Sequence, residues 1–296
     1  MKKKYAGVVV PMITPVDEVG QIDMLSVTKI IKRFAACGVS PLLMGAAGEG
    51  YSLSNEQVIK LARTVINTPH ENMIIYMELN GSCLNEQLRL ADQLTLLDAD
   101  VMVVTLPPYY ALTAKQMYHY YRTLADRLSV PLMIYNNPST THQSIPVEVV
   151  KQLSEHPNIV GMKDAERDLG RMEACIRLAH NHADFSYFCG WAAQCANSLE
   201  MGADGIVPAT GNYVPELFAD LYDKVLTHDM TAARTLQVRA DRIARICHAD
   251  RLPGESLAAL KVMMTHKGLC QPYMIPPLTR LTPEEEKDIV ARLKFN

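Results

Sequence analysis

Eight short apolar runs recur along the 296-residue chain, and stretches with helical spacing separate most of them. An apolar run bounded by turn residues is typical of a buried strand, and an apolar period near 3.6 residues is typical of an amphipathic helix. Strand and helix that alternate eight times predict an α/β fold, the closed parallel (β/α)8 or TIM barrel. The expected strands are residues 7–10, 41–45, 73–79, 101–106, 131–136, 159–163, 185–190 and 205–208. The expected helices between them are residues 24–37, 55–67, 84–97, 114–128, 146–154, 169–181 and 192–201.

The chain continues well beyond the last expected strand. Helical spacing returns in residues 215–227, 231–248, 256–267 and 283–294, and no linker rich in glycine or serine precedes them. A separate second domain is therefore not expected. We predict a barrel in residues 1–210 and a C-terminal helical extension, packed on that barrel, in residues 211–296.

Composition and charge narrow the classes of function. The formal net charge is −3 and there is no basic block, so neither nucleic acid nor a membrane is an expected partner. No segment approaches the roughly 20 apolar residues of a membrane helix, and the N-terminus makes a poor signal peptide. The seven cysteines are scattered and form no CxxC pair, which disfavours a disulfide framework and a zinc site. We expect a cytoplasmic protein that binds a small molecule and holds no metal.

Lys163 is the most informative of the residues that end the expected strands, where barrels of this type place their active sites. It ends the apolar run Ile-Val-Gly-Met, and lysines are seldom buried without a partner or a purpose. One interpretation is a lysine that extends to solvent along its apolar stem. The other is a Schiff-base nucleophile, whose pKa desolvation must lower so that free amine exists near neutral pH.

Two further strand ends favour the second interpretation. Tyr135 ends the preceding expected strand, and adjacent parallel strands lie about 4.8 Å apart, so its phenol can lie next to the amine of Lys163. A packed aromatic side chain is the alternative for Tyr135 alone, whereas imine chemistry needs a proton donor of this kind. The turn at residues 45–48 allows close approach of backbone and can hold a carboxylate through its amides, although such turns also serve packing alone.

Taken together, these elements resemble the dihydrodipicolinate synthase / N-acetylneuraminate lyase family of pyruvate-dependent class I aldolases and dehydratases. The resemblance covers nearly the whole chain and rests on six segments in the family's order. They are GVVVP at 7–11, GAAGE at 45–49, PYY at 108–110, YNNP at 135–138, GMKD at 161–164 and GADGIV at 202–207.

The resemblance implies roles for three catalytic residues. Lys163 would form the imine with a 2-oxo acid, and Tyr135 would be the general acid/base. Tyr110 would enter the active site of a neighbouring subunit, which implies a homo-oligomer, commonly a tetramer. No metal and no organic cofactor would be needed, because the protonated imine is itself the electron sink.

The resemblance also implies a substrate pocket, in which this chain departs from the family. Ala46 and Ala47 would form the carboxylate-binding turn, but the family usually has hydroxyl residues there that link its tyrosines. The backbone of Gly190 and Ile206 would line the pocket. Thr140 stands where the synthase branch has an arginine for its dicarboxylate substrate, which disfavours lysine biosynthesis.

The expected function is therefore a Schiff-base lyase that cleaves a 2-keto-3-deoxy sugar acid to pyruvate and an aldehyde. Dehydration of such an acid through the same imine is the first alternative. A non-catalytic 2-oxo-acid binding protein, in which the relay at residues 46 and 47 has been lost, is an alternative of another class. The choice between cleavage and dehydration is expected to depend on a distal pocket formed by Thr140, Thr141, His142, Trp191 and Asn212.

Overall fold

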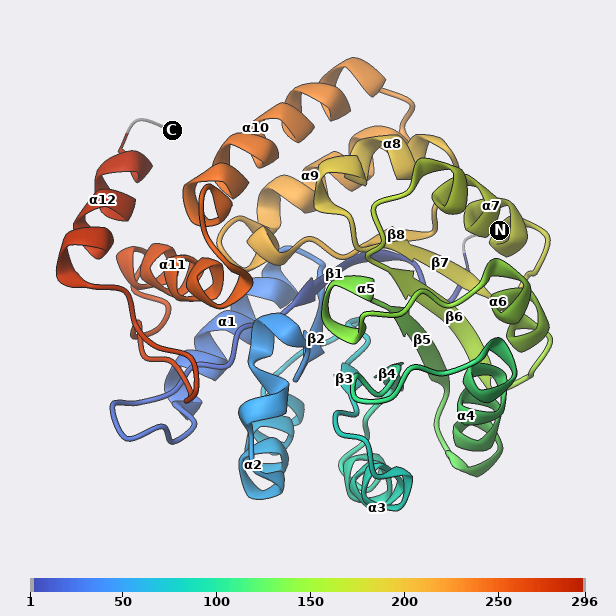
Figure 1. The fold of residues 1–296 in the computed structure, drawn as a ribbon. Coiled ribbons are helices and arrows are strands. Elements are labelled where there is room, and N and C mark those ends of the chain that lie inside the picture. Colours follow the sequence, from blue (N-terminus) through green and yellow to red (C-terminus); the bar gives the residue numbers. More distant parts are fainter. Residues whose placement is uncertain (1–2, 295–296) are drawn as a thin grey trace.

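A computed structural model describes residues 3–294 and shows a closed barrel of eight parallel strands, in the order β1 to β8 (Figure 1). The predicted (β/α)8 barrel is confirmed, and each strand overlaps an expected apolar run. The strands are β1 Gly7–Pro11, β2 Ser40–Leu43, β3 Tyr76–Glu78, β4 Val101–Thr105, β5 Leu132–Asn136, β6 Ile159–Asp164, β7 Ser186–Cys189 and β8 Gly205–Ile206.

Helices surround the barrel, as the apolar spacing predicts. Ser54 and Thr113 each begin a helix with a reciprocal capping box, in which side chains satisfy the free amides of the first turn. The helices that follow the strands are α1 Met24–Ala36, α2 Asn55–Ile66, α3 Leu84–Thr95, α4 Ala114–Arg127, α5 Pro138–Thr141, α6 Val147–Ser154, α7 Leu169–His180, α8 Cys195–Glu200 and α9 Pro215–Leu226. Short 3₁₀ turns are η1 Ala46–Gly48, η2 Gly50–Ser52, η3 Ala192–Gln194 and η4 Ala209–Asn212.

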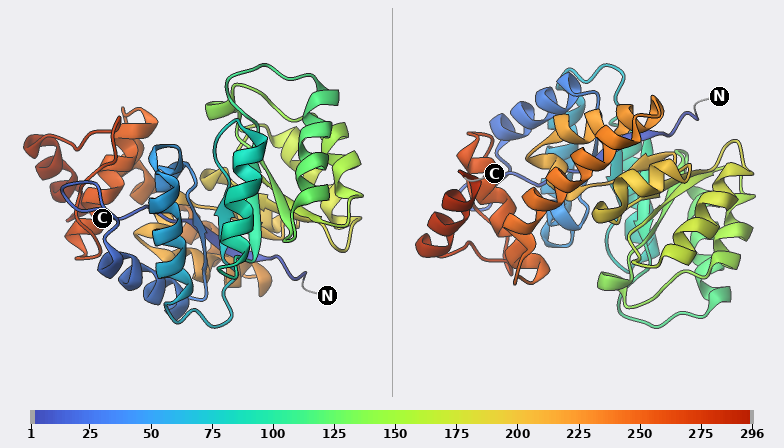
Figure 2. Two further views of the ribbon diagram at one scale, coloured as in Figure 1. Left: turned by 90° about the horizontal axis from the view of Figure 1, so that it is seen from below. Right: turned by 90° about the horizontal axis from the view of Figure 1, so that it is seen from above.

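Three C-terminal helices complete the fold: α10 Met230–His248, α11 Pro253–His266 and α12 Pro283–Leu293. In both views of Figure 2, α11 and α12 lie on one side of the barrel, opposite the side of α4 and α6. The expected C-terminal helices are present. The boundary between barrel and extension after residue 210 stays a prediction.

In two of the elements that are shorter than expected, side chains take the place of regular backbone hydrogen bonds. The amides of Ile74 and Ile75 donate to Ser40 Oγ and Asp100 Oδ2, so β3 begins only at Tyr76. The expected helix 192–201 divides into η3 and α8. There the side chain of Gln237 donates to the carbonyl of Ala192 and accepts from the amide of Ala196.

The core has two layers separated by the strands. One apolar cluster fills the barrel and includes Tyr76, Met133, Tyr135 and Phe188, and a larger one lies between the barrel and its helices. Successive strand residues point to opposite faces, so every second side chain points inward. This alternation decides which residues at the strand ends can reach the barrel mouth.

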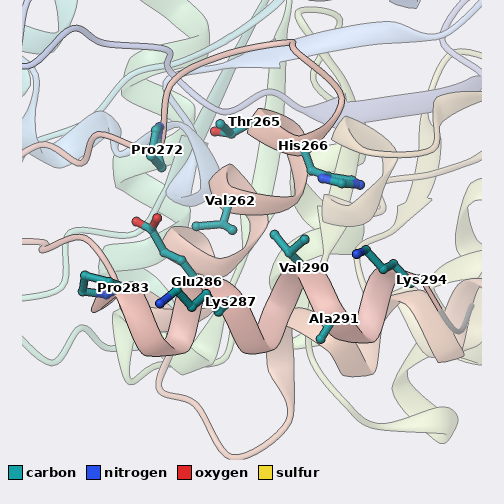
Figure 3. A pocket seen from close by; sticks show the side chains of 10 residues that line it. All are labelled: Val262, Thr265, His266, Pro272, Pro283, Glu286, Lys287, Val290, Ala291 and Lys294. Carbon is teal, nitrogen blue, oxygen red and sulfur yellow. The ribbon is translucent and has the colours of Figure 1, made fainter.

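Outside the barrel, α11 and α12 enclose a groove of about 570 Å³. Figure 3 shows Val262 and His266 of α11 opposite Val290 of α12 and Lys294, which directly follows α12. None of the residues that line this groove belongs to a strand end. The candidate active site is therefore expected at the barrel mouth and not in this groove. Over residues 3–294, every helix is too short or too polar to cross a membrane.

Candidate active site

Lys163 and Tyr135 are direct neighbours across β5 and β6. Their Cα atoms are register partners, and Thr105 of β4 is the next partner beyond Tyr135. The Lys163 Nζ lies 3.5 Å from the centroid of the Tyr135 ring, a distance at which the negative face of an aromatic ring attracts an ammonium group. The structure therefore brings together the two residues that the sequence singles out at these strand ends.

Burial changes the protonation of Lys163. Its side chain lies inside the barrel mouth, and the residue is only 5% exposed. Desolvation lowers the pKa of Lys163 from 10.5 to about 8, against the opposing effect of the Glu78 carboxylate. A substantial fraction of free amine therefore exists at mildly alkaline pH, as a nucleophilic lysine requires.

Glu78, the last residue of β3, is a part of the site that the sequence analysis missed. It is 3% exposed, and burial raises the pKa of its carboxyl from 4.5 to about 7, while the charge of Lys163 opposes this rise. Glu78 Oε2 has no hydrogen-bond partner in residues 3–294. The sequence held a signal for it: a glutamate two residues after Tyr76, in the apolar run IIYMEL, shares the inward face of its strand.

The Tyr135 hydroxyl is held by Asn137, whose side-chain amide donates to it over 3.1 Å. Burial raises the pKa of Tyr135 far above 10, and the nearby carboxyl groups of Glu78 and Asp164 add to the rise. The phenol therefore keeps its proton at physiological pH and can donate it. Asn137 precedes α5, a single helical turn that the sequence analysis did not predict.

A buried polar network fixes the carboxyl ends of β5 and β6. Asp164 accepts 2.8 Å hydrogen bonds from the Asn136 side chain and from Arg171 Nε of α7. Arg171 also donates to the carbonyl of Ile145, and the amide of Ile145 donates to the side chain of Asn136. These bonds tie both strands to the loop beyond them, so Lys163 is held on a rigid support.

The turn after β2 is the 3₁₀ turn η1, which contains Ala46 and Ala47. Ala46 is exposed and Ala47 is buried. The hydroxyl of Thr14 donates to the carbonyl of Gly48 at 2.6 Å, and a Cβ atom at Gly48 would come within 2.8 Å of the Met12 carbonyl oxygen. Only glycine fits at residue 48, so the turn lies directly against the end of β1.

The remaining predicted site residues lie around the mouth. Tyr110 is 67% exposed in the loop after β4, with its ring edge-to-face against Tyr109. Thr140 is exposed on α5, and its hydroxyl donates to the carbonyl of Asn137. Gly190 follows β7. The side chain of Ile206 packs in the outer core, which leaves only its backbone to face the barrel.

The predicted distal pocket is only partly available. Thr141 is buried and donates to two backbone carbonyls, while His142 is exposed. Trp191 is half-buried beside η3. The side chain of Asn212 is fully buried and bonds to the backbone of residues 11, 13 and 209, so it fixes β1 and has no free group for a substrate.

This geometry defines a class of protein: a (β/α)8 barrel with a desolvated lysine at the end of β6 is the scaffold of a class I, pyruvate-dependent aldolase or lyase. The chain belongs to the dihydrodipicolinate synthetase family, whose model matches residues 4–296. The family resemblance seen in the sequence is confirmed. Within residues 3–294, no group of histidine, cysteine and acidic side chains could hold a metal ion.

Similar proteins act on more than one substrate. The chain is 27% identical over 291 residues to the 4-hydroxy-tetrahydrodipicolinate synthase of Phenylobacterium zucineum, covering 98% of this chain and 97% of that protein. It is also 27% identical over 292 residues to the probable 2-dehydro-3-deoxy-D-pentonate aldolase YjhH of Escherichia coli, covering 97% and 96%. The dihydrodipicolinate synthase structure from Bacteroides thetaiotaomicron superposes with a TM-score of 0.94 at 24% identity, over 100% of both chains, which shows the shared fold.

Proposed function

We propose that this protein cleaves a 2-keto-3-deoxy sugar acid to pyruvate and an aldehyde through an imine on Lys163. The observation that carries the proposal is the buried amine of Lys163, which lies 3.5 Å from the centroid of the Tyr135 ring and has a pKa lowered to about 8. A free amine can attack the keto carbon, and the resulting iminium withdraws electrons from the bond that breaks.

Thr140 supports a sugar acid over a dicarboxylate substrate. It is a neutral, exposed residue on α5, and its hydroxyl cannot replace the bidentate pair that a guanidinium forms with a second carboxylate. A hydroxyl does suit the hydroxyl groups of a sugar acid. The name of the E. coli relative, a probable 2-dehydro-3-deoxy-D-pentonate aldolase, agrees with this substrate class.

The proposed imine on Lys163 also assigns roles to the other residues of the site. Tyr135, whose phenol keeps its proton, is the general acid/base. The amides of Ala46 and Ala47 bind the substrate carboxylate, and the backbone of Gly190 and Ile206 lines the pocket. Because Tyr110 is exposed, we assign it to the active site of a neighbouring subunit in a homotetramer. A cytoplasmic location is part of this proposal, and all seven cysteines are free thiols.

The decisive experiment is borohydride reduction in the presence of pyruvate, followed by peptide mass spectrometry. We expect a three-carbon addition on Lys163, because desolvation frees this amine near neutral pH. Lys163→Ala should lose both the addition and all turnover while keeping its melting temperature within a few degrees. Lys115→Ala, at an exposed position on α4, is the matched control and should label normally. Addition on another lysine, or none, would disprove the imine mechanism.

A panel of 2-keto-3-deoxy acids then identifies the reaction. Release of pyruvate with an aldehyde supports cleavage. Loss of water with the carbon chain intact supports the dehydratase alternative instead. A rise in melting temperature with pyruvate, without turnover of any member of the panel, supports the binding protein.

A further inference from the structure

The proposed cleavage assigns no role to Glu78, although this residue lies in the same barrel mouth as Lys163. We propose that Glu78 is the acid/base partner of Lys163: it takes the proton of the Lys163 ammonium before attack and returns it to the hydroxyl that leaves as the imine forms. This inference rests on the proposed imine and deepens it.

The position of Glu78 in β3 places its side chain on the inward face of the barrel. Tyr76 belongs to the cluster inside the barrel, and Glu78 lies two residues further along the same strand, so it shares the inward face. The charge of Glu78 raises the pKa of Lys163 in β6, and the charge of Lys163 lowers the pKa of Glu78. The two groups therefore interact across the interior of the barrel from strands that are not neighbours.

Gly45 makes room for this carboxyl at the end of β2. A Cβ atom at residue 45 would lie 3.2 Å from Glu78 Oε2, closer than a methyl group normally approaches an oxygen. The backbone of Gly45 has an ordinary extended conformation, with φ of −70°, so strain does not require glycine here. A side chain at residue 45 would therefore require the Glu78 carboxyl to shift by a few tenths of an ångström.

Glu78 also lines a small polar cavity, of about 150 Å³, together with Tyr51 and Asn80. Among the described residues, Glu78 Oε2 and Asn80 Oδ1 are both buried without a hydrogen-bond partner. A water molecule occupies roughly 30 Å³ and needs two or more polar partners, so the cavity can hold a short water chain. Such a chain gives the buried carboxyl of Glu78 water with which to exchange protons.

Four titratable groups surround Glu78: Lys163 of β6, Tyr135 of β5, Tyr51 of η2 and Tyr121 of α4. Burial raises the pKa of all three tyrosines, so they stay neutral near pH 7. The pKa values of Glu78 and Lys163, about 7 and about 8, remain close together. Transfer of a proton from Lys163 to Glu78 is therefore unfavourable by only about tenfold in equilibrium.

The proton count of the step balances. Lys163 begins as an ammonium and Glu78 as a carboxylate, and transfer of one proton gives an amine and a carboxylic acid. The amine attacks the keto carbon, the C–N bond forms, and the nitrogen proton moves to the former carbonyl oxygen to give a carbinolamine. Glu78 then protonates that hydroxyl, the C–O bond breaks, water leaves, and the nitrogen lone pair forms the iminium. Glu78 ends as the carboxylate with which it began.

The test measures imine formation against pH. Protein and pyruvate are mixed for set times, excess borohydride stops the reaction, and mass spectrometry measures addition on Lys163. The pair holds one shared proton chiefly between pH 7 and 8, so the rate for the unmodified protein should pass through a maximum there and fall at higher pH. Glu78→Gln should lose the falling limb and be slower by about tenfold or more at pH 7.5, since general acid/base catalysis contributes at least that much.

A purely electrostatic role for Glu78 predicts the opposite result. Loss of the carboxylate would lower the pKa of Lys163 further, because Glu78 opposes desolvation, and Glu78→Gln would then form the imine faster below pH 8. That outcome, or equal rates in the two proteins, overturns the inference. Glu78→Asp keeps a carboxyl and should restore the falling limb in part, and it provides the test if the glutamine variant does not fold.

A control variant, Glu86→Gln, and the labelling of the unmodified protein distinguish a failure of this inference from a failure of the proposed function. Glu86→Gln removes an exposed carboxylate of α3 that pairs with Arg89, and both limbs of its profile should match those of the unmodified protein. If the unmodified protein adds no pyruvate at Lys163, the imine itself is refuted. If it does, while Glu78→Gln adds pyruvate equally fast, only the role of Glu78 is refuted.

Discussion

Desolvation moves Lys163 and Glu78 in opposite directions: it lowers the pKa of the cation to about 8 and raises that of the acid to about 7. The charge of each group partly offsets the pKa shift that desolvation causes in the other. The interior of the barrel thus brings two groups, whose pKa values ordinarily differ by six units, to within about one unit of each other. In the proposed mechanism, this near match allows the carboxyl to take the proton of the lysine and to return it.

The pKa of Lys163 predicts how stability depends on pH. The folded-state value of about 8 lies below the ordinary value of 10.5, so between these pH values the unfolded chain binds the proton that the folded chain has released. Stability must therefore rise with pH across this window. Against Lys163→Met, the free energy of unfolding should increase by on the order of 3 kcal/mol between pH 8 and 10.5, measured by urea denaturation. Parallel curves for the two proteins would contradict the lowered pKa.

At this scale the sequence was sufficient to single out Lys163 and Tyr135, which the structure places side by side, because a polar residue that ends an apolar run is visible in one strand. Their catalytic roles stay predictions. It was insufficient for Glu78, because its importance depends on a lysine in a strand that is not its neighbour. Asn212 shows the reverse case. It follows β8 as a pocket residue would, but three backbone contacts occupy its side chain.

At the scale of elements, one buried ion pair connects the turn after β2 to the C-terminal helix α11. Glu49 pairs with Lys261, and both side chains are fully buried. Glu49 also accepts from the amide of Ile275, and Lys261 donates to the carbonyl of Tyr273, each at 2.7 Å. The turn that contains Ala46 and Ala47 is thus held from outside the barrel.

Breaking the ion pair between Glu49 and Lys261 should lower the free energy of unfolding. Lys261→Met leaves Glu49 buried without its counter-charge, so we expect a loss of about 3–5 kcal/mol in the free energy of unfolding. Adding Glu49→Gln should recover much of that loss, as urea denaturation of the double variant can measure. The exposed pair of Arg234 and Glu200 provides the control, and Arg234→Met should cost about 1 kcal/mol or less. A similar cost for both pairs would show that the buried pair does not anchor the turn.

The pattern of elements was predictable because the strands and most of the helices, apart from the single turn α5, each have their own apolar period. The exceptions arise from contacts between distant segments. The side chain of Gln237 in α10 forms hydrogen bonds with backbone groups of the expected helix 192–201. The side chain of Asp100 accepts a hydrogen bond from the backbone amide of Ile75, just before β3. Neither residue lies near these elements in the sequence, so local periodicity gives no sign of the change.

At the scale of the whole molecule, the exposed Tyr110 predicts an active site shared between subunits. Tyr110→Phe and Lys163→Ala should each be inactive alone, since one lacks the donated hydroxyl and the other lacks the nucleophile. Mixed oligomers should regain partial turnover, because some sites then combine an intact Lys163 with an intact Tyr110 from the neighbour. The measurement is turnover after co-refolding, with mixed assemblies verified by native mass spectrometry. Mixed assemblies without activity would mean that Tyr110 does not act across the interface.

The pair of Glu49 and Lys261 also sets an order of events during synthesis on the ribosome. All eight strands are translated before α11, so a nascent chain can contain the complete set of barrel strands while Glu49 still lacks its partner. Domains generally begin to fold from the N-terminal part as they emerge. The turn at residues 45–48 therefore gains this contact only after α11 has been synthesised, and a chain truncated before Pro253 would contain Lys163 without the anchored turn.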